Sequence, residues 1–152
     1  MELYRINISI GDRSVATVVR QGVLASIETG VAVNGMRKPL SRILAIVNDG
    51  SDGPVSWVQV AEFDESGSPK VAFEGWVTRN SPGRLQALGK SQPLRASLET
   101  VEDPSEEMLK CQADAKFGSM SCCTSYGNGC YVTCCNSCCS DPVGCPGAGC
   151  CG

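Results

Sequence analysis

Cysteine is concentrated at the C-terminal end of the chain. Ten of the eleven cysteines lie between Met120 and Gly152, whereas the first 110 residues contain none. A packed core uses cysteine only as one small apolar residue among several, so this density points to chemistry of the thiols themselves. The remaining cysteine, Cys111, stands apart, and we expect it to be an isolated thiol. The ten clustered residues are Cys122, Cys123, Cys130, Cys134, Cys135, Cys138, Cys139, Cys145, Cys150 and Cys151.

Small and hydroxyl-bearing residues surround these thiols. Glycine precedes Cys130, Cys145 and Cys150, while serine precedes Cys122 and threonine precedes Cys134. A Cys, Ser or Thr side chain can attack the preceding carbonyl to give an azoline, and a thiolate can add to a dehydrated Ser or Thr to give a thioether. Both reactions need small neighbours, and the sequence leaves both open. All ten cysteines are therefore candidate modification sites.

Metal binding is an alternative use of the same thiols. Cys135 and Cys138 form a CxxC unit, and Cys130 and Cys134 form a CxxxC unit, which are spacings found in zinc sites. Thiolates also suit copper(I). The sequence contains no CxC unit, on which metallothioneins rely heavily. A metallothionein-like protein that holds zinc or copper(I) through the ten cysteines remains an alternative hypothesis.

Disulfide bonding is the third use. Ten is an even number, and in small disulfide-rich scaffolds the members of adjacent cysteine pairs bond in different directions. The connectivity cannot be read from the sequence. This alternative makes the chain a structural or assembly protein that reaches an oxidising compartment and associates through the edges of its sheets.

The cysteine-free part must supply the scaffold. Alternation and β-branched residues predict strands at Leu3–Ile10, Ser14–Val19, Val23–Val33, Ile43–Val47, Val55–Phe63 and Val71–Thr78. The last two are separated by the turn sequence DESGSP and form a predicted hairpin. The expected fold class is mainly β, a small antiparallel sandwich or barrel over residues 1–100.

A short helix is expected between the scaffold and the cysteines. Asp103 is a suitable cap, Pro104 fits the first turn, and Glu106 follows three residues after the cap. The helix should cover residues 104–116 and end at Gly118. The expected organisation is a β-rich domain at 1–102, a helical spacer at 103–119 and an irregular Cys-rich tail at 120–152.

Composition argues against several function classes. Histidine is absent, which removes the commonest general base and nitrogen ligand, and no other catalytic constellation is evident. We therefore expect no catalytic residues and no cofactor. A net charge of −3 without a basic stripe argues against nucleic acid as a partner. No apolar run is long enough to cross a membrane, and the N-terminus has no features of a signal peptide, so we expect cytoplasmic synthesis.

The layout resembles precursors of ribosomally synthesised, post-translationally modified peptides. In that class a leader recruits modifying enzymes, and a short C-terminal core rich in Cys, Ser, Thr and Gly is altered and released. The resemblance makes residues 1–119 the leader and 120–152 the core, with Gly118 and Ser119 similar to the site cut by leader peptidases of the double-glycine type. It implies modifying enzymes and a leader peptidase or exporter as partners, and export of the processed tail. The leading hypothesis is a non-enzymatic precursor of a small, bacteriocin-like bioactive peptide.

Overall fold

The computed structural model describes residues 2–11, 13–79, 85–88, 94–106, 109, 122–127 and 130–139. These residues form eleven strands, which are antiparallel wherever they pair. The strands are β1 (Leu3–Ile10), β2 (Arg13–Arg20), β3 (Ala25–Val33), β4 (Met36–Gly50), β5 (Gly53–Phe63), β6 (Pro69–Thr78), β7 (Leu85–Ala87), β8 (Leu94–Val101), β9 (Cys122–Gly127), β10 (Cys130–Cys135) and β11 (Cys138–Cys139).

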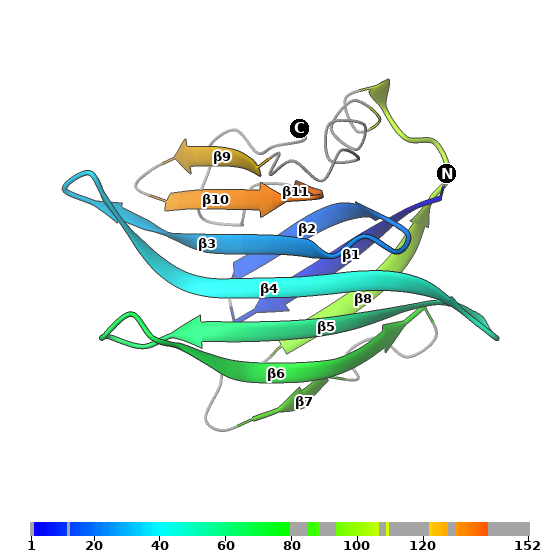
Figure 1. Cartoon of the computed structure of the whole chain (residues 1–152), viewed down its shortest axis with the longest axis horizontal. Coiled ribbons are helices and arrows are strands. Elements are labelled where there is room, and N and C mark those ends of the chain that lie inside the picture. The colour runs from blue at the N-terminus through cyan, green and yellow to red at the C-terminus, as the bar shows by residue number, and fades with distance from the viewer. Residues whose placement is uncertain are drawn as a thin grey trace.

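Two sheets pack face to face in these residues. One sheet has four strands in the order β11-β2-β1-β8, and the other has seven in the order β7-β6-β5-β4-β3-β10-β9. Figure 1 shows the seven-stranded sheet in front of the four-stranded one. The expected fold class, mainly β in antiparallel sheets, is confirmed.

Alternate residues of β4 contribute to the core, as the alternation predicts. On β4 the buried residues are Ile43, Ala45 and Val47, and their neighbours point outward. Ile6 and Ile8 of β1 face them from the other sheet, and all five side chains belong to one apolar cluster. Burying a valine- or isoleucine-sized side chain stabilises the fold by about 1.5–3 kcal/mol.

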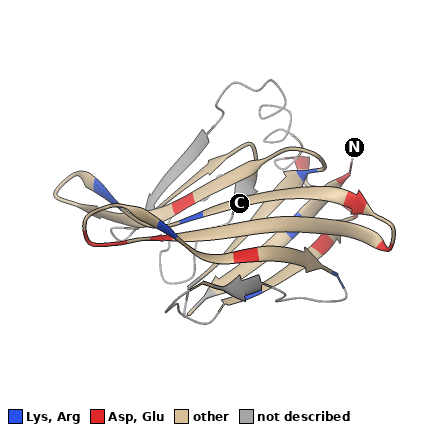
Figure 2. Ribbon diagram, turned by 60° about the horizontal axis from the view of Figure 1, so that its bottom comes forward, with Lys and Arg blue, Asp and Glu red and all other residues tan. Residues whose placement is uncertain are grey.

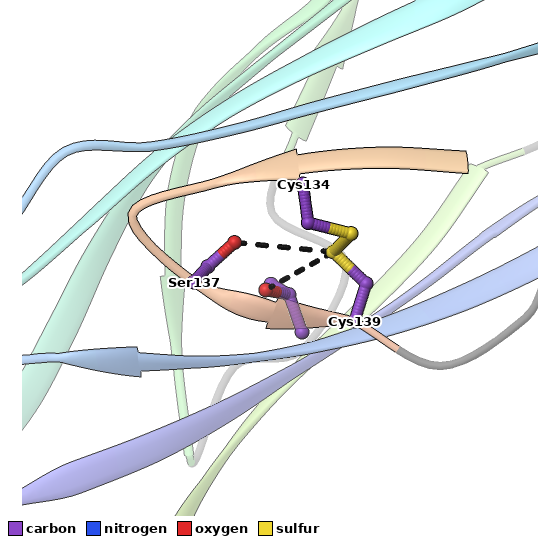
Figure 3. The surroundings of a disulfide bond; sticks show 4 residues. Cys134, Ser137 and Cys139 are labelled. Carbon is purple, nitrogen blue, oxygen red and sulfur yellow. Dashed lines mark hydrogen bonds between the residues drawn. A yellow bond between two sulfur atoms is a disulfide. The ribbon is translucent and has the colours of Figure 1, made fainter. Parts of the chain in front are cut away.

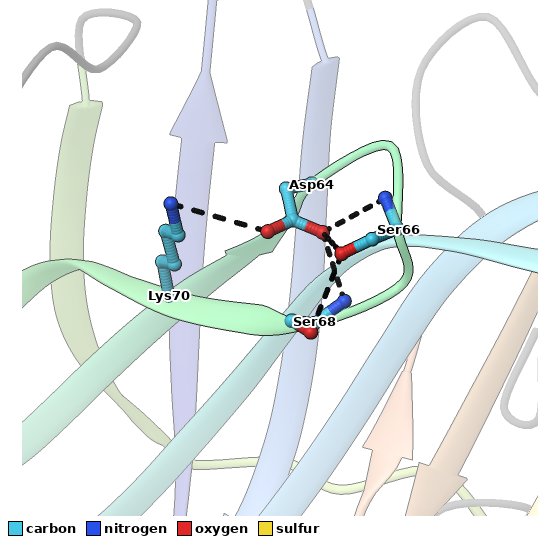
Figure 4. A network of polar contacts seen from close by, with 4 residues as sticks. All are labelled: Asp64, Ser66, Ser68 and Lys70. Carbon is cyan, nitrogen blue, oxygen red and sulfur yellow. Dashed lines mark hydrogen bonds and ion pairs between the residues drawn. The ribbon is translucent and has the colours of Figure 1, made fainter.

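The predicted hairpin is present as β5 and β6. Its loop is ordered by Asp64, whose Oδ1 accepts hydrogen bonds from the backbone N–H groups of Ser66 at 3.0 Å and Ser68 at 2.9 Å (Figure 4). The Ser66 hydroxyl also donates to this oxygen at 2.6 Å. These bonds lower the pKa of Asp64, with the Ser66 hydroxyl as the largest cause. Gly67 takes a φ of 86° in the turn, a conformation that glycine adopts without steric cost.

The expected helix falls mostly outside the described residues. Within them, Leu109 N–H donates to the carbonyl of Ser105 at 3.0 Å. The junction at Gly118 and Ser119 also lies outside them. No helix among the described residues is long and apolar enough to cross a membrane.

The Cys-rich segment, residues 120–152, requires a correction. It was expected to be irregular, but residues 122–139 contribute β9, β10 and β11 to the two sheets. β10 pairs with β3 along six residues, and β11 pairs with β2. The physical reason is that β2 and β3 would otherwise leave backbone N–H and C=O groups unpaired, and the segment supplies their partners.

Candidate functional site

The cysteines of β10 alternate between the two faces of the seven-stranded sheet. Val132 and Cys134 point into the core and are 1% and 0% exposed, respectively. Their neighbours Thr133 and Cys135 are half-buried on the outer face. Because successive strand residues point to opposite faces, adjacent cysteines on β10 cannot share one partner or one metal ion.

Cys134 forms a disulfide with Cys139, five residues further along the chain (Figure 3). Cys134 belongs to the seven-stranded sheet and Cys139 to the four-stranded sheet, so this inter-sheet disulfide crosses the core. The two Cα atoms are 6.1 Å apart, within the range that a disulfide spans. Both residues are completely buried. Reagents in solvent therefore cannot reach this bond while the sandwich is folded.

Two hydroxyl groups contact the inter-sheet disulfide. The Oγ atoms of Ser137 and Thr17 each lie 3.9 Å from the Sγ of Cys139 (Figure 3). A disulfide sulfur carries no proton, so the hydroxyls are the donors in these weak contacts. Ser137 and Thr17 are themselves buried, and Thr17 is the register partner of Cys139.

The chain crosses between the sheets at Asn136. This residue has a φ of 59°, and asparagine is among the few residues that adopt this left-handed conformation readily. Its Nδ2 atom donates a hydrogen bond to the carbonyl of Leu24 at 3.3 Å. The crossing is thereby attached to the segment that connects β2 and β3.

Tyr131 holds β10 to the outer face of the same sheet. Its ring lies against Gly30, and its hydroxyl donates to the Glu28 carboxylate at 2.8 Å. The Arg37 guanidinium lies 5.3 Å from the ring centroid, within the range of a cation–π interaction. Tyr131 is only 1% exposed. β10 is thus anchored on both of its faces.

The remaining candidate residues fall into two groups. Cys130 and Cys135 are also disulfide-bonded, Cys122 and Cys123 lie in β9, and Cys138 lies in β11. The rest lie outside the described residues: Cys111, Gly118, Ser119, Cys145, Cys150 and Cys151.

The bonded state of these cysteines bears on metal binding. Metals are bound by thiolates, and a sulfur in a disulfide is not a thiolate. Among the candidate ligands in the described part of the chain, Cys130, Cys134, Cys135 and Cys139 are disulfide-bonded. Within the part of the chain that the structure describes, no group of three or more Cys, Asp or Glu residues is arranged to hold a metal ion.

One further titratable group is perturbed for structural reasons. Burial raises the pKa of Tyr4 well above its ordinary value of 10.0, and a hydrogen bond to the Glu2 carboxylate raises it further. Tyr4 lies on β1 and belongs to the apolar core, and its hydroxyl donates to the Glu2 carboxylate. The shift in pKa therefore reflects burial and two carboxylate neighbours, Glu2 and Asp49.

The contacts that anchor β10 were missed from the sequence. Tyr131, Val132 and Thr133 are an aromatic and two β-branched residues in a row, which is a strand signal. The cysteines that flank these residues obscured that signal. Gly30 and Glu28 gave no sequence signal of this contact, because their partner Tyr131 lies about a hundred residues away.

The fold and this site define an antiparallel β-sandwich whose two sheets are linked by a buried disulfide near the end of the chain. No family model, curated protein or solved structure matches the chain.

Proposed function

We propose that this protein is a non-enzymatic, disulfide-stabilised β-sandwich that serves as a structural or assembly protein. The observation that carries the proposal is the complete burial of Cys134 and Cys139 in a bond between the two sheets. A thiol that is to be modified by an enzyme must be accessible, whereas a structural disulfide is best placed where solvent is excluded.

The position of β10 supports the same proposal. β10 lies between β3 and β9, and Val132 is part of the core. Cleavage at Gly118–Ser119 followed by release of residues 120–152 would remove β9, β10 and β11 together. It would expose the apolar residues that β10 covers, such as Ile27, its neighbour across from Cys134. Release at that position is therefore unfavourable for the folded protein.

The proposal requires an oxidising compartment at maturity, because cytoplasmic thiols are kept reduced. It also requires surfaces for assembly. The seven-stranded sheet ends at β9 and the four-stranded sheet ends at β8, and strand edges of this kind can pair with another copy of the chain.

Peptide mapping of the native protein tests this function. The chain would be isolated from its host with free thiols blocked, digested, and analysed by mass spectrometry before and after reduction. We expect a peptide pair linked through Cys134 and Cys139, a gain of two hydrogens per disulfide on reduction, and full-length protein. Loss of water from Ser or Thr, or cleavage near Ser119, would contradict the proposal, as would zinc or copper(I) bound to free thiols.

A second candidate function is the precursor of a modified peptide whose released segment is shorter than residues 120–152. The observation that favours it is the order along the chain: Cys145, Cys150 and Cys151 all follow β11, the last strand described. In this form the sandwich through Cys139 is the recognition and carrier part, and residues 140–152 are the segment that modifying enzymes alter and a peptidase or exporter releases. The same mass measurement tests it, since the modification must then be confined to residues 140–152.

A further inference from the structure

Two tryptophans lie side by side on the outer face of the seven-stranded sheet. Trp57 of β5 is the register partner of Trp76 of β6, with ring centroids 5.6 Å apart and planes inclined by 55°. Their chain neighbours Val58 and Val77 are fully buried, so both indoles point away from the core. Figure 1 shows no described element in front of β4, β5 and β6.

The pairing of the rings does not account for the exposure of Trp76. A cross-strand aromatic pair stabilises a sheet through ring contact alone, and Trp57 is half-buried in that role. Trp76, however, leaves 52% of its surface in solvent. On the other side of Trp57 lies Ile46 of β4, which is half-buried. The row Ile46, Trp57 and Trp76 crosses three strands and spans about 10 Å, given a strand spacing of about 4.8 Å.

A polar pair lies in the next row of the same face. Gln59 is opposite Glu74, and the Gln59 Nε2 atom donates to the Glu74 Oε2 atom at 3.4 Å. This contact leaves the Gln59 Oε1 atom and the other Glu74 oxygen as acceptors. Residues two apart on a strand are about 7 Å apart, so these acceptors lie beside the indole rings.

The charges around this surface restrict its ligand. Figure 2 shows the Lys, Arg, Asp and Glu residues of the described strands and turns scattered over the ribbon, with no gathering of basic residues. Glu74 gives the tryptophan surface a negative charge, which disfavours anionic ligands. The surface therefore combines a flat apolar platform with hydrogen-bond acceptors beside it. A ligand that matches it has an apolar face, several hydroxyl donors and no negative charge.

We propose that Trp57, Trp76, Gln59 and Glu74 form a binding site for a neutral polysaccharide. The C–H face of a pyranose ring packs on the open face of Trp76, and its hydroxyl groups donate to Gln59 and Glu74. A few polar groups beside an apolar surface are enough to fix the orientation of a ligand. The site is distant in sequence from the inter-sheet disulfide. The proposal of this binding site therefore does not depend on whether the protein acts in assembly or as a precursor.

Affinity electrophoresis of the oxidised full-length chain tests the site. The gels would contain hydroxyethyl cellulose, laminarin, xyloglucan or galactomannan, with polygalacturonate as an anionic comparison. We expect at least one neutral polymer to retard the protein and to change its tryptophan fluorescence, and polygalacturonate to do neither. Trp76→Ala should weaken binding about tenfold or more, as for a tryptophan at the centre of a contact surface. Met36→Ala is the matched control, because Met36 is 75% exposed at the start of β4, away from the site.

A conservative variant tests the polar half of the site. Glu74→Gln keeps the shape of the side chain, and we expect it to bind the neutral polymer more weakly and to discriminate less against polygalacturonate. Near-ultraviolet circular dichroism would verify that each variant is folded. The proposal is overturned if no neutral polymer retards the protein, or if Trp76→Ala is retarded as strongly as the parent chain. It is also overturned if the fluorescence of Trp76 responds to tetramethylammonium, a cation that binds aromatic rings, and not to a sugar. Concentration-dependent dimerisation abolished by Trp76→Ala would also overturn it.

Discussion

Gly30 is a residue at which a single added carbon would disturb the structure. A Cβ atom there would meet the backbone carbonyl of Lys38 and would lie 2.7 Å from two ring carbons of Tyr131. Real Cβ atoms essentially never approach other atoms so closely. β10 can lie flat against β3 only because this position has no side chain.

We therefore predict that Gly30→Ala destabilises the protein by about 1–3 kcal/mol, the usual cost of overpacking. Urea unfolding followed by tryptophan fluorescence would measure it. Ser26→Ala, on the same strand, is the control and should change stability by much less. Tyr131→Phe keeps the ring and removes the hydroxyl that donates to Glu28, so we expect an intermediate cost of about 0.5–1.5 kcal/mol. Equal stability of Gly30→Ala and the parent chain would show that β10 does not pack on Gly30.

The loop at Asp64 should respond to pH. The pKa of Asp64 is lower in the folded loop than in the unfolded chain, where it is about 3.9. The carboxylate thus stabilises the loop fully above that value, and the stabilisation is lost as the pH falls through the lower folded pKa. We expect the protection factors of the Ser66 and Ser68 amides, the ratios of intrinsic to observed exchange rates measured by NMR, to fall as the pH drops below 4.

Asp64→Ala should abolish this pH dependence, because the Ser66 and Ser68 amides then lack their acceptor at every pH. Asp52→Ala, which alters the turn between β4 and β5, should leave it unchanged. Identical protection of the Ser66 amide in the parent chain and in Asp64→Ala would contradict the role of the carboxylate.

At the scale of elements, the inter-sheet disulfide should act mainly on β10 and β11. β11 has two residues and pairs with β2 alone, so few backbone hydrogen bonds hold it in place. We predict that replacing Cys134 and Cys139 together by alanine destabilises the protein by about 2–5 kcal/mol. Hydrogen exchange should show the largest loss of protection in β11 and the adjacent part of β2. Met36→Ala, at the exposed start of β4, is the control and should change neither quantity. Uniform loss across β4 and β5 would contradict this local role.

The strands of the cysteine-free part were predictable because burial on one face imposes a period of two. Leu3–Ile10 matches the observed β1, and the predicted hairpin appears with each strand beginning two residues earlier than expected. The hairpin could be predicted because its turn chemistry, Asp64 to Gly67, is local. The pairing of Trp76 with Trp57 on the outer face was not predictable in this way, because it depends on the register shift at the bulge after Val60.

The candidate site was predictable only in part. The sequence indicated that adjacent cysteines bond in different directions, and Cys134 and Cys135 do point to opposite faces of the sheet. It gave no sign that Cys134 would meet Cys139, because that pairing depends on Asn136 and Ser137 carrying the chain from one sheet to the other. Such crossings are set by tertiary packing, which local patterns do not encode.

For the whole molecule, two truncations separate the functional proposals. A chain that ends at residue 139 keeps all the described strands, and a chain that ends at residue 119 loses β9, β10 and β11. We predict that residues 1–139 unfold cooperatively with nearly the stability of the full chain, and that residues 1–119 are strongly destabilised or aggregate through the open edge of β3. Size-exclusion chromatography and thermal unfolding would measure this. Equal stability of both truncations would favour an independent leader domain that ends before the cysteines.

The place of β10 and β11 in the sequence also fixes when the sandwich can be completed during synthesis. A ribosome delivers β1 through β8 first, so β2 and β3 have no partner on one side until residues 130–139 emerge. Cys134 and Cys139 belong to strands of different sheets, so the native bond between them requires that both β10 and β11 have emerged. A chain interrupted between these two residues leaves the Cys134 thiol without its partner and available to a quality-control oxidoreductase.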